Sequence, residues 1–525
     1  MSPDPASPER ENPDAVVAAP PSPHESSVVE VRHGAYHDSV SLMQVSRAVA
    51  RTDGVTAAQV AMATELNVEV LTGMGFVVPE GTGPNDLLVA VRGESEDALE
   101  AGLAAVDAEL AALRSGSGGG DGMGERPPAR TVGSAARAVD ATLALISVPG
   151  RHAVTETYDA IAAGLSVMLF SDNVAVEDEI RLKDSAREAG VLVMGPDCGT
   201  ALVRGVALGF ANVVRDGSVG LVAASGTGAQ QVMCLLDAAG VGVSHCLGVG
   251  GRDLSAAVGG RSTRQALEAL AADPATTSVI VVSKPPDDGV LAEVRSAADR
   301  LGLQVHWAIL GAGRPDLTVS VESALAALGR TVPTWPARTA EPEPSGTTRG
   351  SALRGLFCGG TLADEAMVVA ADLLADPIRS NIAHDDALRV DGDARVEGHL
   401  VVDFGDDAMT QGRAHPMIDP GLRLDRIRAE AADPTCGVLL LDLVLGHGSH
   451  PDPADELADA VRSARVTAHE AGRALPVVVS LTGTDADPQG YARTADVLAG
   501  AGASVFLSNA AATRHAVAQL EGSAS

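Results

Sequence analysis

The chain has 525 residues, 38 Lys+Arg against 69 Asp+Glu, a formal net charge of −31, and only 2 Trp, 3 Tyr and 6 Phe. Nucleic-acid binding requires basic surfaces and stacking rings, so this composition excludes it, and the same charge excludes an anionic membrane surface. The hydrophobic fraction of 46% is that of a globular protein rather than a disordered acidic chain. A typical size of about 150 residues per domain predicts three to four domains.

The N-terminal residues 1–27 are rich in proline and have no basic or apolar stretch, which predicts a disordered tail and no signal peptide. Since no apolar run approaches the roughly 20 residues of a membrane span, we expect a cytoplasmic protein. From 28 to 114, strand and helix patterns alternate three times, which predicts a small α+β domain with helices at 39–51 and 96–114. A linker rich in Gly, Ser and Pro follows at 115–130.

From residue 131 onward, short apolar runs alternate with helical segments, the pattern of buried parallel strands in doubly wound sheets. The pattern predicts α/β domains at 131–215, 216–330 and 352–525, with a second, proline-rich linker at 331–351. The expected strands are the apolar runs 143–148, 166–170, 191–195, 218–224, 278–284, 304–311, 352–360, 399–405, 437–446, 475–483 and 503–508.

Two glycine turns open helices in these domains. ASGTG (224–228) and CGGT (358–361) each follow a strand, within segments 218–236 and 353–374 that resemble each other as a weak internal repeat. Free N–H groups at a helix start bind anions, and glycine lets a phosphate approach closely. Either turn alone also serves simply to reverse the chain, but the duplication predicts that at least one holds phosphate and that the two units face each other.

Cationic residues follow two other strands. In GVGGRDLS, Arg252 can clamp a phosphate or carboxylate, the alternative being a surface ion pair with Asp253. Lys284 is one of only two lysines, with Lys183, against 36 arginines, a bias that a GC-rich gene explains. Because Lys284 ends a strand before two prolines, its ammonium can polarise a carbonyl group, the alternative being a solvated loop lysine.

The remaining polar motifs point to less specific roles. In GRAHPMIDP, Arg413 can bind a carboxylate and His415 can move a proton. Cys198 in GPDCGT is interpreted as a small packed residue, because a nucleophilic role requires a lowered pKa. His447 and His450 lack a third ligand pattern, and the five cysteines form no C-x-x-C pair, so we predict neither a metal site nor a disulfide framework.

Several of these motifs are long, and together they resemble the FdrA family from about residue 28 to 515. The segments that carry the resemblance are AYHDSVSLMQVSR, LFSDNVAVEDEIRLK, VMGPDCGT, GLVAASGTG, GVGGRDLS, VVSKPP, CGGTLADEA, DFGDDAMTQGRAHPMIDP and TGTDADPQ. The central part is similar to the α chain of succinyl-CoA synthetase. The part that begins at residue 352 is similar to the C-terminal ligase domain of the β chain of that enzyme. The resemblance implies an α/β protein with a small α+β N-terminal domain, a CoA-binding-type Rossmann domain and two flavodoxin-like ligase domains.

In the synthetases, turns like ASGTG and CGGT open two facing helices that grip a phosphoryl group. The synthetases also carry a phosphorylated histidine in a G-H-A-G loop, but the corresponding region here, WAILGAGRPDL (307–317), leads into no such histidine. An ATP-grasp domain, which would charge that histidine, has no room in the sequence. The resemblance therefore implies a retained anion cradle without the covalent relay.

The FdrA family is linked to carbamoyl transfer between carbamoyl phosphate and oxamate or oxalurate in allantoin breakdown. On this resemblance, Lys284 would stabilise the oxyanion, Arg413 would hold the oxamate carboxylate and His415 would manage the proton of the attacking amide. The phosphate would be held by Arg252 and by the backbone of Ser225, Gly226, Thr227, Gly228, Gly359, Gly360 and Thr361.

The resemblance also implies small anionic substrates and other carbamoyltransferase subunits as partners in a hetero-oligomer, with a homodimer as an alternative. No cofactor is required, and CoA binding stays open. One alternative function is an acyl-CoA synthetase subunit whose missing parts lie on another chain. Another is a non-catalytic regulatory or scaffold protein with 28–114 as an interaction module, since a fold does not fix a function.

Overall fold

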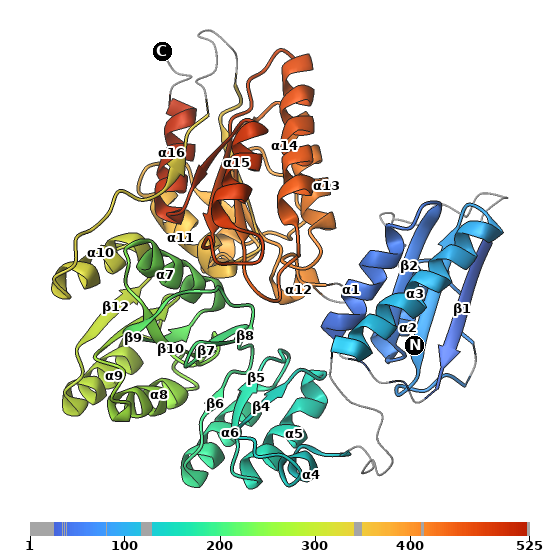
Figure 1. The fold of residues 1–525 in the computed structure, drawn as a ribbon. Helices are drawn as coiled ribbons and strands as arrows, with labels where there is room; N and C mark the ends of the chain where they lie inside the picture. The colour runs from blue at the N-terminus through green and yellow to red at the C-terminus, as the bar shows by residue number, and fades with distance from the viewer. Residues whose placement is uncertain are drawn as a thin grey trace, which may run out of the picture. The chain divides into compact units, whose positions relative to one another are not determined.

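The computed structural model describes residues 26–521 apart from short gaps, and it divides into two compact units between Glu125 and Arg126 (Figure 1). The gaps are residues 34, 36, 38, 80, 117–128, 341–348 and 411–413. Of the expected tail at 1–27, only Ser26 and Ser27 lie within the described residues, and both belong to a strand. Most of the linker expected at 115–130 also lies outside them.

The smaller unit is a three-stranded antiparallel sheet in the order β1-β3-β2 with three helices. Its elements are β1 (Ser26–Arg32), α1 (Ser39–Ala50), β2 (Val55–Met62), α2 (Glu65–Gly73), β3 (Leu87–Gly93) and α3 (Glu96–Gly116). Successive residues of a strand point to opposite faces, so Val89 packs in the cluster with α1 and α3 whereas Leu88 packs with Leu71 of α2. The prediction of a small α+β domain with helices near 39–51 and 96–114 is confirmed.

The larger unit begins with a parallel three-stranded sheet in the order β4-β5-β6. Its elements are α4 (Val132–Ala136), β4 (Leu143–Ile146), α5 (Gly150–Ala162), β5 (Ser166–Leu169), α6 (Val176–Ala189) and β6 (Val193–Met194). Val167 and Leu182 belong to one buried cluster, which shows how the apolar stripe of α6 closes over the sheet.

A six-stranded sheet follows, in the order β12-β11-β9-β10-β7-β8. Its strands are β7 (Thr200–Val203), β8 (Val206–Gly209), β9 (Asp216–Ala224), β10 (Val243–Gly248), β11 (Ser278–Ser283) and β12 (Val305–Ile309). Its helices are α7 (Gly226–Ala238), α8 (Arg261–Ala272), α9 (Asp288–Leu301) and α10 (Leu317–Ala327). The strands β9 to β12 are parallel, and apolar runs predict β9, β11 and β12, whereas β10, which contains Ser244 and His245, is not among the expected runs.

The hairpin β7–β8 is an element that the apolar runs do not reveal. It lies before the boundary expected at 216, yet Leu202 of β7 pairs with Cys246 of β10, so the hairpin extends the six-stranded sheet. Strand pairing of this kind depends on which edge is open in three dimensions, and the local sequence does not carry that information.

The last sheet has seven strands in the order β13-β19-β18-β17-β14-β16-β15. Its strands are β13 (Ala337–Arg338), β14 (Ala352–Phe357), β15 (Ile378–Ser380), β16 (His399–Asp403), β17 (Cys436–Val444), β18 (Val477–Thr482) and β19 (Ala503–Phe506). Its helices are α11 (Gly360–Ala371), the short 3-10 helix η1 (Asp386–Leu388), α12 (Asp407–Thr410), α13 (Gly421–Ala432), α14 (Pro453–Glu470), α15 (Tyr491–Gly500) and α16 (Asn509–Glu521). β13 pairs antiparallel with β19, so part of the linker expected at 331–351 is an edge strand.

The six- and seven-stranded sheets share one continuous apolar core. Leu221 of β9, Leu356 of β14 and Leu481 of β18 belong to the same buried cluster. Gln231 of α7 donates to the carbonyl of Leu507, directly after β19, at 2.9 Å and so links the two sheets. The structure therefore packs the two ligase-like segments against each other, as the internal repeat predicts.

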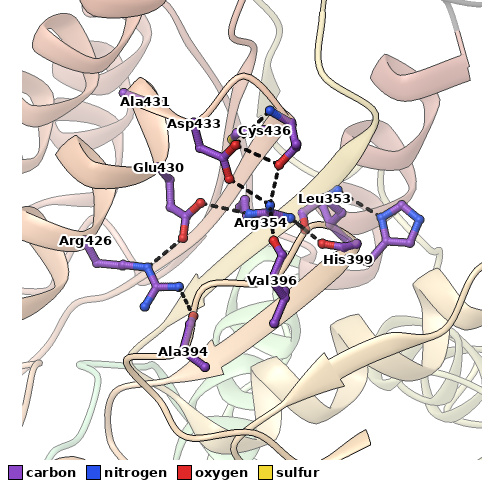
Figure 2. A network of polar contacts seen from close by, with 12 residues as sticks. Leu353, Arg354, Ala394, Val396, His399, Arg426, Glu430, Ala431, Asp433 and Cys436 are labelled. Atoms are coloured by element: carbon purple, nitrogen blue, oxygen red, sulfur yellow. Dashed lines mark hydrogen bonds and ion pairs between the residues drawn. The ribbon is translucent and has the colours of Figure 1, made fainter.

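A buried arginine cross-links the end of the C-terminal sheet away from the glycine turns (Figure 2). Arg354 of β14 is 1% exposed and donates to the carboxylates of Glu430 at 2.8 Å and Asp433 at 3.0 Å. It also donates to the carbonyl of Val396 at 2.7 Å and to the hydroxyl of Thr435 at 2.8 Å. A planar guanidinium presents five donors, so this one side chain holds a strand, a loop and the end of α13 together.

Candidate functional site

The two glycine turns identified from the sequence meet in space. Ser225 caps α7 by accepting the N–H of Gly228 at 3.0 Å, and its hydroxyl donates to Thr361 Oγ1 in the first turn of α11 at 2.7 Å. Each turn follows a strand at its carboxyl end, β9 in one case and β14 in the other. The N-termini of α7 and α11 therefore lie side by side, the arrangement predicted for two units that face each other.

Glycine is needed in these turns because the two backbones approach closely. A Cβ atom on Gly228 would lie 2.9 Å from Cγ2 of Thr361, and one on Gly359 would lie 2.8 Å from the side chain of Thr227. Such distances lie below the contacts that real Cβ atoms make, so a larger residue would separate the helix starts. The contact thus brings together all seven backbone residues that the sequence predicts for phosphate.

Some of the backbone N–H groups predicted to bind phosphate already have an acceptor within the protein, and the others are open, meaning that they have none among the described residues. Gly228 N–H is used by Ser225, and Gly359 N–H donates to Asp442 Oδ2 at 2.9 Å. Within the part of the chain that the structure describes, the N–H groups of Gly226, Thr227, Gly360 and Thr361 have no acceptor. These donors, with the positive ends of two helix dipoles, form a positive surface where an anion can bind.

A buried ion pair holds the second glycine turn, CGGT (358–361), in place. Arg423 donates to Asp442 Oδ1 at 2.7 Å, and both side chains are almost completely buried. Asp442 in turn accepts the N–H groups of Cys358 at 2.8 Å and Gly359 at 2.9 Å. Burial raises the pKa of the Asp442 carboxyl, while Arg423 and the two N–H groups oppose that shift. The sequence analysis singled out neither residue.

Lys284 lies at the start of α11. A Cβ on Gly360 would lie 3.1 Å from Lys284 Nζ, and Nζ is 3.9 Å from Asp364 Oδ2. The side chain is 38% exposed, so the ammonium is accessible to a substrate. β11 neighbours β9 in the sheet, which explains why Lys284 and Ser225 share one edge. The structure thus brings this lysine to the turns that the sequence proposed for phosphate.

Carboxyl groups with raised pKa values surround Lys284, and none of them is among the site residues predicted from the motifs. Burial raises the pKa of Asp403 and of Asp197 to about 7 in each case, against an opposing effect of Lys284. Burial also raises the pKa of Asp407. The pKa of His384 is raised in turn by its hydrogen bond to Asp364. The signal that could have found part of this set is the acidic run DFGDD directly after a strand.

Arg252 lies against α6. Its guanidinium is 3.0 Å from Glu179 and donates to the carbonyl of Val174 at 2.8 Å, and its side chain is 45% exposed. Its described contacts are with these two residues, while electrostatic effects on Asp197 and Asp407 connect it to the surroundings of Lys284.

Lys183 is buried and structural. Its Nζ donates to Glu179 at 2.7 Å, to Asp253 at 2.7 Å and to the carbonyl of Val249 at 3.0 Å. Asp253 also accepts the N–H groups of Ser262 and Thr263 at the start of α8. This network joins α6 to the GVGGRD turn, so of the two lysines only Lys284 is accessible to solvent.

His415 lies close to the second turn. A Cβ on Gly405 would lie 2.8 Å from His415 Nε2 and 3.2 Å from Asp403 Oδ1. Met417 N–H donates to His415 Nδ1 at 3.2 Å, which assigns the ring hydrogen to Nε2. Burial lowers the pKa of His415 to about 4, so the ring is neutral near pH 7. Arg413 lies outside the described residues.

The other motif residues have structural contacts. Cys198 is buried against Gly248, and burial raises the pKa of its thiol to about 12. His450 Nδ1 accepts the N–H of Asp452, and the backbone of His447 pairs with Ala211. Among the residues that the structure describes, no group of three or more His, Cys, Asp or Glu side chains is placed to hold a metal ion. No helix in the described part is long and apolar enough to cross a membrane.

Two family models match the chain. Residues 25–127 match the model described as AllF, heavy metal-associated domain, and residues 356–519 match the model described as CoA-ligase. The segment 25–127 contains no cysteine, so it lacks the thiolates that soft metals prefer, and among its described residues no group of three or more His, Cys, Asp or Glu side chains is placed to hold a metal ion.

Curated relatives match different parts of the chain. The protein YahF of Escherichia coli is 38% identical over 494 residues, covering 90% of this chain and 95% of YahF. The succinate–CoA ligase subunit alpha 2 of Archaeoglobus fulgidus is 32% identical over 146 residues, covering 27% of this chain and 50% of the ligase subunit.

Among solved structures, a dinucleotide-forming acetyl-coenzyme A synthetase of Ca. Korarchaeum cryptofilum is 18% identical, with a TM-score of 0.30, covering 78% of this chain and 89% of the synthetase chain. The assignment rests instead on the CoA-ligase match and on the relative that spans nearly the whole chain. The chain belongs to the FdrA family of succinyl-CoA-synthetase-like proteins.

Proposed function

We propose that this protein is the phosphate-binding subunit of a carbamoyltransferase that moves a carbamoyl group between carbamoyl phosphate and oxamate. The observation that carries the proposal is the meeting of two helix N-termini with open N–H groups beside the ammonium of Lys284. A carbamoyl phosphate has both a phosphate for the helix starts and a carbonyl for the ammonium. The FdrA family membership supports oxamate as the acceptor.

The open N–H groups of Gly226, Thr227, Gly360 and Thr361 bind the phosphate through hydrogen bonds and the helix dipoles. Lys284 stabilises the oxyanion that forms on the carbamoyl carbon in the transition state. Since these groups are already arranged in the folded protein, catalysis comes from positioning and electrostatics and needs no covalent enzyme intermediate.

The acceptor side of the proposed site consists of two arginines and a histidine. In the proposal, Arg413 binds the carboxylate of oxamate, as a planar guanidinium suits a bidentate carboxylate. Arg252 serves as a further clamp when a substrate anion competes with Glu179 for its guanidinium. His415 stays neutral and donates from Nε2. Other carbamoyltransferase subunits complete the site, and we propose that the assembly works in the cytoplasm.

The direct test uses the purified full chain, alone and combined with proteins encoded beside its gene. Oxalurate and inorganic phosphate are supplied, and oxamate and carbamoyl phosphate are measured. We expect turnover that depends on phosphate, and we expect Gly226→Val to abolish it while the circular dichroism spectrum stays that of the wild type. Gly500→Ala is the matched control, because no atom lies within 4 Å of a Cβ at that position. Absence of turnover in every combination contradicts the proposal.

A second candidate is an acid–CoA ligase subunit. The CoA-ligase match at 356–519 and the identity to succinate–CoA ligase α subunits favour it. Against it stands the lack of a histidine like the phosphorylated one that the synthetases carry after the region corresponding to 307–317. The discriminating measurement is hydroxamate formation from carboxylic acids with ATP, CoA and hydroxylamine. CoA-dependent hydroxamate without oxalurate turnover supports the ligase and contradicts the carbamoyltransferase.

A further inference from the structure

We propose that Asp403 carries the proton of the transfer reaction, beside Lys284 at the start of α11. The inference rests on the proposed function and adds a catalytic residue that the motifs did not single out. Asp403 is the last residue of β16, and it pairs with Phe357 of the neighbouring strand β14. Its carboxylate therefore lies at the same sheet edge as the Cys358–Gly360 turn.

The two oxygens of Asp403 have different surroundings. Oδ1 accepts the N–H of Gly405 at 2.8 Å, which fixes the plane of the carboxylate. A Cβ on Gly360 would lie 2.6 Å from Oδ2 and 3.1 Å from Lys284 Nζ, so this oxygen and the ammonium lie beside the same residue. Asn381 Oδ1 accepts the N–H of Asp403 at 2.9 Å, and Asn381 Nδ2 donates to the carbonyl of Asp403 at 2.8 Å. Asp403 is thus held in place next to the open N–H groups.

Burial and the charges around Asp403 together place its pKa near neutral pH. Asp403 is 5% exposed, and burial raises its pKa to about 7 although Lys284 lowers it. Asp442 of β17 and Asp406 of the following loop raise it further. His415 faces it across Gly405 as a neutral ring. A general acid–base works best when its pKa lies near the operating pH.

His415 is less suited to this task. Its Nδ1 already accepts a hydrogen bond from Met417, and burial lowers its pKa to about 4. A ring with that pKa gives a hydrogen bond from Nε2 but takes up almost no proton near pH 7. The proton of the acceptor amide therefore passes to Asp403, and His415 serves as a hydrogen-bond donor.

In both directions of the reaction, Asp403 carries one proton between the amide nitrogen and the phosphate. When carbamoyl phosphate reacts with oxamate, the amide nitrogen attacks the carbamoyl carbon, a C–N bond forms and the C–O bond to phosphate breaks. Ionised Asp403 takes the proton of the attacking nitrogen and passes it to the leaving phosphate, which departs as monohydrogen phosphate. In the reverse direction, protonated Asp403 gives its proton to the departing amide nitrogen of oxalurate and recovers one from monohydrogen phosphate.

The experiment compares Asp403→Asn with the wild type between pH 5.5 and 9, in the protein combination that supports turnover. In the wild type, synthesis of oxalurate requires the ionised form and rises with pH through about 7, whereas phosphorolysis falls over the same range. We expect Asp403→Asn to lose at least about 100-fold in kcat in both directions and to lose these pH limbs. Binding of inorganic phosphate, measured by calorimetry, should remain.

Two further variants complete the test. Asp459→Asn is the control, since it removes an exposed carboxylate on α14 that takes no part in the proposed step, and it should keep the rate of the wild type. In Lys284→Met, the pH at which the remaining activity changes should be higher by about one unit, because loss of a nearby cation raises the pKa of a carboxyl group. An Asp403→Asn variant with wild-type rates and pH limbs overturns this inference alone. A wild type without oxalurate turnover overturns the proposed function and this inference with it.

Discussion

Replacing Arg423 by methionine tests whether a buried ion pair holds the second glycine turn. Arg423 is 2% exposed, and its Nη1 lies 2.7 Å from both Oδ1 and the carbonyl oxygen of Asp442. Methionine keeps most of the volume but removes the charge and both hydrogen bonds. Asp442 is completely buried and keeps as donors the N–H groups of Cys358 and Gly359 and the thiol of Cys358.

Removal of one partner of a buried pair typically costs about 3–5 kcal/mol, because the other charge stays buried without compensation. The remaining N–H and thiol donors stabilise the carboxylate, so we expect a cost at the lower end of this range, about 3 kcal/mol at pH 8. Burial already raises the pKa of Asp442 in the wild type, and loss of Arg423 raises it more. A carboxyl with a raised folded-state pKa destabilises the fold increasingly as pH rises above its ordinary value of about 3.9. The loss should therefore be smaller at pH 5 than at pH 8.

The assay is urea unfolding followed by tryptophan fluorescence. Both tryptophans, Trp307 and Trp335, belong to the larger unit, so the signal follows the unit that contains the pair. The double variant Arg423→Met with Asp442→Asn removes both charges and should recover most of the lost stability. A loss under about 1 kcal/mol at pH 8, or a loss that does not change with pH, refutes the reasoning.

Three other predictions follow from the buried polar groups. Arg354→Lys should lower the free energy of unfolding by about 3 kcal/mol, since one ammonium cannot reproduce the planar set of donors; an unchanged urea midpoint contradicts this. Lys183→Met should cost about 3–5 kcal/mol, because it leaves Asp253 buried without a cation and Glu179 with only the half-exposed Arg252, and thermal unfolding checks it. All five cysteines are buried, so a thiol reagent at pH 8 should modify none in the native protein and five in denaturant; one fast thiol in the native state disproves the burial.

Much of the architecture could be read from local patterns. Apolar runs predicted the long buried strands such as β9, β14 and β17, because a strand covered on both faces must be apolar along its length. The short elements β7, β8, β13 and β15 escaped, since two to four residues carry little periodicity and pair only where a sheet edge is open.

The residues of the candidate site were likewise only partly predictable from local sequence patterns. The glycine turns and Lys284 were visible because a strand, a tight turn and a helix start leave a local signature. Asp442 and Arg423 were not, and Asp403 was visible only as part of the acidic run DFGDD, since their importance comes from burial and from neighbours far away in the sequence.

The amino-acid sequence by itself determined the alternation of strands and helices, the position of the two turns and the membership in a family, because each of these depends on short-range pattern or on similarity. Only the tertiary structure decided which N–H groups stay open, which lysine is buried and which carboxyl groups titrate near neutral pH. The physical reason is that hydrogen-bond partners and desolvation are set by contacts between distant segments.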